Sequence, residues 1–128
     1  KLHLVKPLGF DISEKAVKRA GLDYWPYVDL EIHESLDDFM EKYKDKRKFL
    51  ATTKGGRIYT DFEYIDDDMF LFGRETKGLP RDFIAQNEEM AIRIPMSENT
   101  RLRSFNLSNS ANIILFEALR QLGFPELK

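Results

Sequence analysis

The chain has 128 residues, of which 42% are hydrophobic and 33% are charged, and its net charge at pH 7 is −2. This length and composition predict one soluble, folded domain over residues 1–128 and exclude a disordered chain. The small negative charge excludes nucleic-acid binding through a diffuse basic field, and the absence of cysteine excludes disulfides and thiol nucleophiles.

The apolar segments are too short to span a membrane, because the longest runs contain four residues and a spanning helix needs about 20. We therefore expect a cytoplasmic protein without membrane partners. The only two histidines, His3 and His33, are interpreted as core or surface side chains, so no metal site is predicted.

Strand and helix patterns alternate along the first half of the chain. Strands are predicted at 2–5, 27–32 and 49–53, and a helix at 13–20 separates the first two. A second helix is expected to begin at Ser35, a helix-capping residue that precedes apolar residues at the helical spacing.

The second half continues this alternation. Strands are predicted at 69–72 and 91–94, with a short helix at 81–86 between them. The strands at 49–53 and 69–72 are expected to be central. The order of elements predicts an α/β fold with a mostly parallel sheet flanked by helices.

The last predicted element is a helix from Ser108 or Asn109 to Leu122, because this stretch lacks glycine and proline and Gly123 follows it. One apolar stripe is expected to pack on the sheet, while Ile113 and Phe116 point elsewhere. Apolar residues thus cover more of the helix surface than one contact needs, and this wide apolar girdle predicts a second contact, with another helix or another subunit. The main stripe consists of Ala111, Ile114, Leu115, Ala118, Leu119 and Leu122.

The segment LFGRETKGLP, residues 71–80, follows a predicted buried strand. It lacks the middle glycine of a dinucleotide-binding fingerprint and the Gly-Lys-Ser/Thr of a phosphate-binding loop. Gly73 and Gly78 permit left-handed backbone or the close approach of a ligand, and Glu75 lies between them. Considered alone, the segment favours a structural turn over a ligand site.

A second polar loop precedes the last helix. Asn106, Ser108 and Asn109 can each cap that helix, and capping explains one or two of them. Capping does not explain all three together with Arg103 and Ser104, so a structural and a functional interpretation both remain open.

Three motifs together resemble a known family: LFGRETKGLP at 71–80, IRIPM at 92–96 and RSFNLSNSANIILFEALRQLG at 103–123. They closely resemble the C-terminal motifs of the SPOUT superfamily of RNA methyltransferases. The small TrmL-type tRNA 2′-O-methyltransferases, which modify a cytidine or uridine at the wobble position, fit best. The upstream segments PLGF, KRAGLDY and ATTKG extend the resemblance over essentially the whole chain.

The resemblance implies a C-terminal trefoil knot within the α/β fold, although threaded chains are rare among proteins. It also implies a homodimer packed through the C-terminal helix, which suits the wide apolar girdle. The implied reaction is 2′-O-methylation of the wobble ribose of tRNA, with S-adenosylmethionine as the methyl donor.

The implied cofactor pocket is formed by loops and contacts the cofactor largely through backbone groups, for which glycine and small residues are suited. The residues that the resemblance assigns to it are Ala51, Gly73, Glu75, Gly78, Ile94, Met96, Ser104 and Phe105.

Three residues of the second loop match family residues that shape the reaction site. The resemblance implies that Arg103 positions RNA or cofactor and that Ser104 and Asn106 form hydrogen bonds. The chemistry requires a ribose 2′-oxygen aligned with the sulfonium methyl group and assistance in losing its proton.

The family also has an N-terminal motif, a strand and an asparagine- and arginine-containing helix, whose arginine assists that deprotonation. The sequence begins at Lys1, within what matches the second strand, so we expect an N-terminally incomplete domain with weak or no turnover. Three alternatives stay open: a ribosomal RNA 2′-O-methyltransferase of the same fold, a non-catalytic module that binds cofactor or RNA, and an unrelated α/β domain whose loops are turns.

Overall fold

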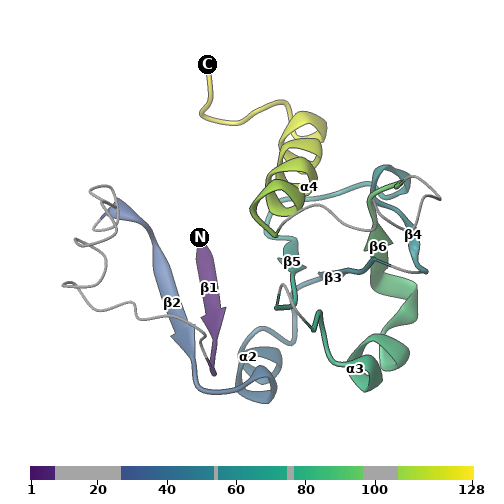
Figure 1. Cartoon of the computed structure of the whole chain (residues 1–128). Helices are drawn as coiled ribbons and strands as arrows, with labels where there is room; N and C mark the ends of the chain where they lie inside the picture. Colours follow the sequence, from purple (N-terminus) through teal and green to yellow (C-terminus); the bar gives the residue numbers. More distant parts are fainter. Residues whose placement is uncertain (8–26, 54, 75–76, 97–106) are drawn as a thin grey trace. The chain divides into compact units, whose positions relative to one another are not determined.

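The computed structural model describes residues 1–7, 27–53, 55–74, 77–96 and 107–128 (Figure 1). The chain divides into two compact units, Lys1–Asp45 and Lys46–Lys128, and each contains a parallel sheet. The predicted helix at 13–20 lies outside the described residues, and a single domain over the whole chain stays a prediction.

The first unit pairs β1 (Leu2–Val5) with β2 (Leu30–His33) in parallel, and α2 (Leu36–Lys42) follows β2. The Oγ atom of Ser35 accepts a hydrogen bond of 3.0 Å from the backbone N–H three residues later. This bond satisfies one of the donors at the helix N-terminus and confirms the predicted helix start. Phe39, on the predicted apolar face, is the buried residue of α2.

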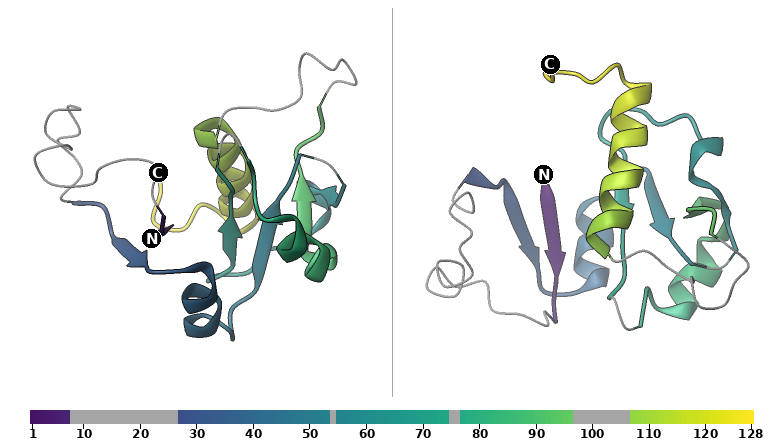
Figure 2. Two further views of the ribbon diagram at one scale, coloured as in Figure 1. Left: turned by 60° about the horizontal axis from the view of Figure 1, so that its bottom comes forward. Right: turned by 45° about the horizontal axis from the view of Figure 1, so that its top comes forward.

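The second unit contains a four-stranded parallel sheet in the order β4-β6-β3-β5 (Figure 2). Its strands are β3 (Lys48–Ala51), β4 (Arg57–Ile58), β5 (Met69–Leu71) and β6 (Ala91–Arg93). Because all four strands run in the same direction, their carboxyl ends lie at one edge of the sheet.

The helix α4 (Leu107–Gln121) packs against this sheet. Its Ile114 and Ala118 are 1% and 6% exposed, and they join Phe49 of β3 and Ile92 of β6 in one buried cluster. Burial of an aliphatic or aromatic side chain of this size stabilises a fold by about 1.5–3 kcal/mol. The helix and the sheet therefore share one core.

Three short elements complete this unit: η2 (Tyr59–Asp61), α3 (Arg81–Gln86) and η3 (Glu88–Met90). Among the described residues, no helix has the length and apolar character that crossing a membrane requires.

The structure confirms the mostly parallel α/β fold and the predicted helix at 81–86, and it corrects two details of the sheet. The strand β4 was not predicted, and β5 is an end strand of the sheet formed by the described residues rather than a central one. Leu115 on α4 is 46% exposed, and Leu122, directly after the helix, is 36% exposed, so part of the predicted core stripe is not buried.

Candidate functional site

Three strands bring predicted cofactor residues to the same edge of the larger sheet. Ala51 ends β3, Gly73 follows β5 by two residues, and Ile94 directly follows β6. Ala51 pairs with Ile92, and the backbone N–H of Thr52 donates to the Ile92 carbonyl oxygen at 2.9 Å. The carboxyl edge of a parallel sheet is where α/β proteins commonly bind ligands, so this edge is the candidate site.

The loop after β5 folds back on itself. The backbone N–H of Gly78 donates to the Arg74 carbonyl oxygen at 2.7 Å. A Cβ atom on Gly73 would lie 2.0 Å from the carbonyl carbon of Gly78, so only glycine fits there. Gly78 has a φ of +68°, which also favours glycine, but a Cβ on it would have no heavy atom within 4 Å.

The two glycines therefore serve different purposes. Gly73 lets the backbone of Gly78 and Leu79 pack directly against it. Gly78 adopts a left-handed conformation and has open space where a side chain would be. The sequence suggested a left-handed backbone or the close approach of a ligand for both glycines. The structure shows the left-handed backbone at Gly78 and gives Gly73 a structural requirement of its own.

A glycine turn also follows β3. Gly55 and Gly56 have φ angles of +72° and +76°, and a Cβ on Gly56 would lie 2.8 Å from the Ala91 carbonyl oxygen. The Thr52 hydroxyl lies 3.3 Å from the Gly55 carbonyl oxygen, to which it donates. Sequence reasoning did not assign Thr52 to the site, although its position directly after a buried parallel strand was a usable signal.

Ile94 and Met96 are half-buried beyond β6, and Ile94 packs against the core cluster. Five of the predicted site residues lie outside the described residues: Glu75, Arg103, Ser104, Phe105 and Asn106.

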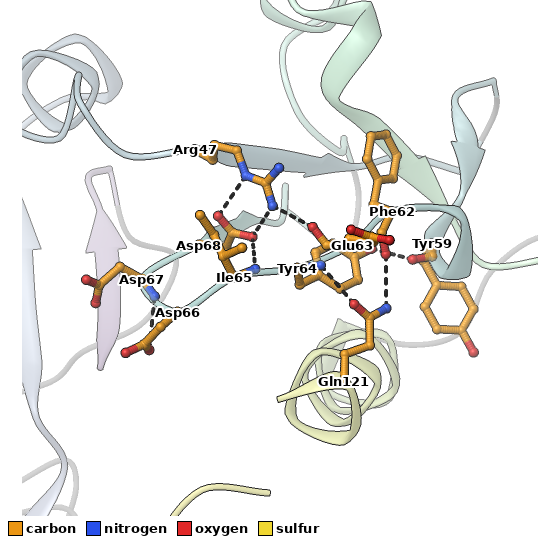
Figure 3. A network of polar contacts seen from close by, with 10 residues as sticks. All are labelled: Arg47, Tyr59, Phe62, Glu63, Tyr64, Ile65, Asp66, Asp67, Asp68 and Gln121. Atoms are coloured by element: carbon orange, nitrogen blue, oxygen red, sulfur yellow. Dashed lines mark hydrogen bonds and ion pairs between the residues drawn. The ribbon is translucent and has the colours of Figure 1, made fainter. Parts of the chain in front are cut away.

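The last turn of α4 is fixed to the segment that precedes β5 (Figure 3). The Gln121 side chain accepts a hydrogen bond from the Tyr64 backbone N–H at 2.8 Å and donates one to the Phe62 carbonyl oxygen at 3.0 Å. These two hydrogen bonds join the C-terminal end of α4 to the segment before β5.

A second attachment in the same segment joins it to the start of β3 (Figure 3). The Arg47 guanidinium donates to both carboxylate oxygens of Asp68, at 2.9 and 2.6 Å, and to the Glu63 carbonyl oxygen at 2.8 Å. The Asp68 carboxylate raises the pKa of Arg47 through these hydrogen bonds, so the guanidinium stays protonated.

Beside this pair, Tyr64 is 4% exposed, and its hydroxyl donates to the Tyr59 carbonyl oxygen. Burial raises the pKa of Tyr64 to about 12, so its hydroxyl remains a hydrogen-bond donor at physiological pH. Hydrogen bonds and core packing therefore hold the segment 59–68 against α4.

Residues 1–116 match the SpoU rRNA Methylase family. A Bacillus subtilis (strain 168) protein with the provisional name tRNA (cytidine(34)-2′-O)-methyltransferase is 48% identical over 130 residues, which cover 99% of this chain and 80% of that protein. A Methylovorus glucosotrophus protein named tRNA (cytidine(34)-2′-O)-methyltransferase is 44% identical over 97% of this chain and 80% of its own length.

Two solved structures have the same fold. A Bacillus anthracis protein provisionally described as an RNA methyltransferase is 44% identical, with a TM-score of 0.93 over 100% of this chain and 81% of that chain. A second, described as "Structural insights into the 2-OH methylation of C/U34 on tRNA", is 38% identical, with a TM-score of 0.83 over 94% of this chain and 78% of that chain. The chain therefore belongs to the SpoU rRNA Methylase family.

Proposed function

We propose that this protein is an S-adenosylmethionine-dependent tRNA methyltransferase that methylates the ribose 2′-oxygen of the cytidine or uridine at position 34. The observation that carries the proposal is 44% identity, over nearly the whole chain, to a protein named for this reaction at cytidine 34. A solved relative described by 2-OH methylation of C/U34 on tRNA supports the same substrate.

The cofactor proposal rests on a solved relative and on the chemistry of the candidate site. The relative, an rRNA methyltransferase from Sinorhizobium meliloti that is 25% identical, is described as bound to AdoMet. In this chain, Gly55 and Gly78 leave open space at the carboxyl edge of the sheet, and half-buried Ile94 and Met96 offer apolar surface. Backbone polar groups beside apolar side chains suit a nucleoside.

When bound, S-adenosylmethionine supplies a methyl group already activated by its positive sulfur. The protein's task is then to hold the ribose oxygen in line and to remove its proton. We assign cofactor contact to Ala51, Gly73, Gly78, Ile94 and Met96. We retain Glu75, Ser104 and Phe105 as further cofactor contacts, Arg103 for RNA positioning, and Ser104 and Asn106 for hydrogen bonding.

The test is transfer of labelled methyl from S-adenosylmethionine to unmodified tRNA, with enzyme in excess so that a slow single turnover is visible. Mass spectrometry of the digested nucleosides should show a 2′-O-methyl ribose, and mass spectrometry of nuclease fragments of the tRNA should locate it at position 34. Methylation of a base, or of ribosomal RNA in preference to tRNA, would contradict the proposal. Cofactor binding without any methyl transfer would favour the non-catalytic module instead.

We further propose that Arg103 contacts tRNA. Replacement of Arg103 by glutamate should weaken tRNA binding by about tenfold or more, because a repulsive charge replaces a phosphate partner. Binding of S-adenosylhomocysteine, measured by calorimetry, should change much less. An equal loss of both affinities would contradict this role.

We also infer a homodimer through α4, a C-terminal trefoil knot and a cytoplasmic location. The dimer is supported by apolar side chains that remain exposed on α4, among them Leu115 at 46% and Phe116 at 54%. Exposed apolar side chains gathered on one element are typical of a protein interface. The knot is supported by the family's architecture, and the location by a tRNA substrate and a chain without cysteine.

A further inference from the structure

Three side chains with metal-binding atoms lie on one face of the two-stranded sheet. His3 on β1 pairs directly with Glu31 on β2, and His33 follows Glu31 by two residues. Side chains two apart on a strand point to the same face, as do directly paired residues of parallel strands. The register therefore places all three side chains together.

Their polar atoms form a compact triangle. His33 Nε2 lies 3.0 Å from His3 Nδ1 and 3.0 Å from Glu31 Oε2, and the third side, from His3 Nδ1 to Glu31 Oε2, is 3.5 Å. Zinc binds imidazole nitrogen and carboxylate oxygen at about 2.0–2.2 Å, so ligand atoms around one tetrahedral zinc are about 3.3–3.5 Å apart. The observed sides are close to that spacing.

Hydrogen bonds alone cannot serve all three contacts. Each imidazole nitrogen carries at most one proton, and both Glu31 carboxylate oxygens already accept hydrogen bonds, one from Lys42 and one from Tyr43. With one proton on either nitrogen, or one on each, at least one side of the triangle has no hydrogen between its atoms. A single cation at the centre would instead accept a lone pair from every corner.

The neighbouring side chains hold the ligands in place. The Tyr43 hydroxyl donates to Glu31 Oε2 at 2.7 Å, and Lys42 donates to the other oxygen, Oε1, at 2.9 Å. Phe39 and Tyr43 contact both imidazole rings edge-on, with ring centroids 5.0–5.9 Å apart. Partners that orient ligand side chains are a general feature of metal sites.

The exposure of the three side chains also suits a metal ion. The side chains of His33, His3 and Glu31 are 5%, 15% and 21% exposed, so the triangle is largely enclosed but reachable from solvent on the Glu31 side.

We propose that His3, Glu31 and His33 bind one divalent transition-metal ion, zinc in the first instance, with a water molecule as the fourth ligand. Two imidazoles and one carboxylate form a donor set that zinc accepts readily. The ion would join β1 to β2 in a unit that buries only Phe39 and His33 among its described residues. This role is structural and independent of methyl transfer, and it revises the sequence-based prediction of no metal site.

The test uses the whole chain after removal of metal with a chelator. Titration with Zn²⁺ in a calorimeter should give one ion per chain, and Co²⁺ should develop the visible absorption of a four-coordinate site. Replacement of His3 by glutamine, or of Glu31 by glutamine, should weaken Zn²⁺ binding by at least about a hundredfold, because each removes a direct ligand.

Glu34→Gln is the matched control, because Glu34 is an exposed carboxylate on the same segment that pairs with Lys6 at 3.1 Å outside the triangle. Its Zn²⁺ affinity should equal that of the unmodified protein. Absence of the Co²⁺ absorption from the unmodified protein would overturn the proposal in favour of a hydrogen-bonded histidine pair. Binding that survives both ligand replacements would overturn it by locating the ion elsewhere.

Discussion

At the scale of single residues, Gly73 is the glycine with the least room for a side chain among those that the structure describes. We expect Gly73→Ala to lower the free energy of unfolding by at least about 2 kcal/mol, because the new Cβ would lie 2.0 Å from the Gly78 carbonyl carbon and the loop must open. Urea denaturation measures the loss, and calorimetry with S-adenosylhomocysteine measures its effect on the candidate site.

Gly123→Ala is the control for this prediction. Gly123 has a φ of +79°, but a Cβ on it would meet no heavy atom within 4 Å. Gly123→Ala should therefore lower the free energy of unfolding by about 1–2 kcal/mol, which is the cost of alanine in a left-handed conformation. If Gly73→Ala proved no more destabilising than Gly123→Ala, the close packing of the loop would be refuted.

Tyr64 makes stability depend on pH in the alkaline range. Burial raises its pKa from 10.0 to about 12 in the folded chain. As pH rises, the Tyr64 hydroxyl therefore loses its proton in the unfolded chain first. The stabilisation that Tyr64 contributes is complete below about pH 10 and is lost as pH rises towards 12.

Urea denaturation at about pH 9 and about pH 11 should show this loss in the unmodified protein. Tyr64→Phe should be less stable than the unmodified protein at pH 9, since it lacks the hydrogen bond to Tyr59, but its stability should fall less between the two pH values. An equal fall in both proteins would exclude Tyr64 as the source.

At the scale of elements, the ion pair between Arg47 and Asp68 joins the start of β3 to the segment before β5. The Asp68 side chain is 3% exposed and accepts three hydrogen bonds, two from Arg47 and one of 2.8 Å from the Ile65 backbone N–H. Asp68→Asn should lower the free energy of unfolding by about 1.5–3 kcal/mol. The replacement removes the negative charge and places an amide NH₂ group, a donor, where a carboxylate oxygen accepted hydrogen bonds.

The adjacent carboxylate provides the comparison, measured in the same denaturation experiment. The Asp67 side chain is 69% exposed and pairs with Lys46 at 3.3 Å, so Asp67→Asn should change stability by no more than about 0.5 kcal/mol. Equal effects of the two replacements would mean that the buried network does not stabilise this connection.

Elements with a strong periodic pattern were predictable from the sequence, and short elements were not. The Ser35 cap and the apolar spacing after it locate α2 correctly. The two-residue strand β4 has no pattern of its own, because Arg57 and Ile58 become a strand only by pairing with β6. Likewise, the exposure of Leu115 depends on how α4 lies on the sheet, which its spacing along the helix does not specify.

The candidate site was predictable in part, for a similar reason. The family motifs assigned Ala51, Gly73 and Ile94 to the cofactor site, and the parallel strand order explains why these residues share an edge of the sheet. The triangle of His3, Glu31 and His33 was not predicted, because His3 and His33 are 30 residues apart in the sequence and only the β1–β2 register brings them together.

At the scale of the whole molecule, exposed apolar side chains on α4 predict self-association. Phe116, 54% exposed, is the largest of them on the helix, and Leu107 and Leu115 are 38% and 46% exposed. A stable dimer needs an interface with a desolvated apolar centre. Phe116→Glu should therefore shift the protein from dimer to monomer in sedimentation velocity at micromolar concentration.

Ile65→Glu is the matched control for that shift, because Ile65 is 57% exposed but lies off α4. Both variants place a carboxylate on an exposed apolar position, so a general effect of charge on association would appear in each. Only Phe116→Glu should dissociate the dimer, since a charge buried at an interface without a partner costs several kcal/mol. A monomeric unmodified protein, or dissociation by both replacements, would contradict an interface centred on α4.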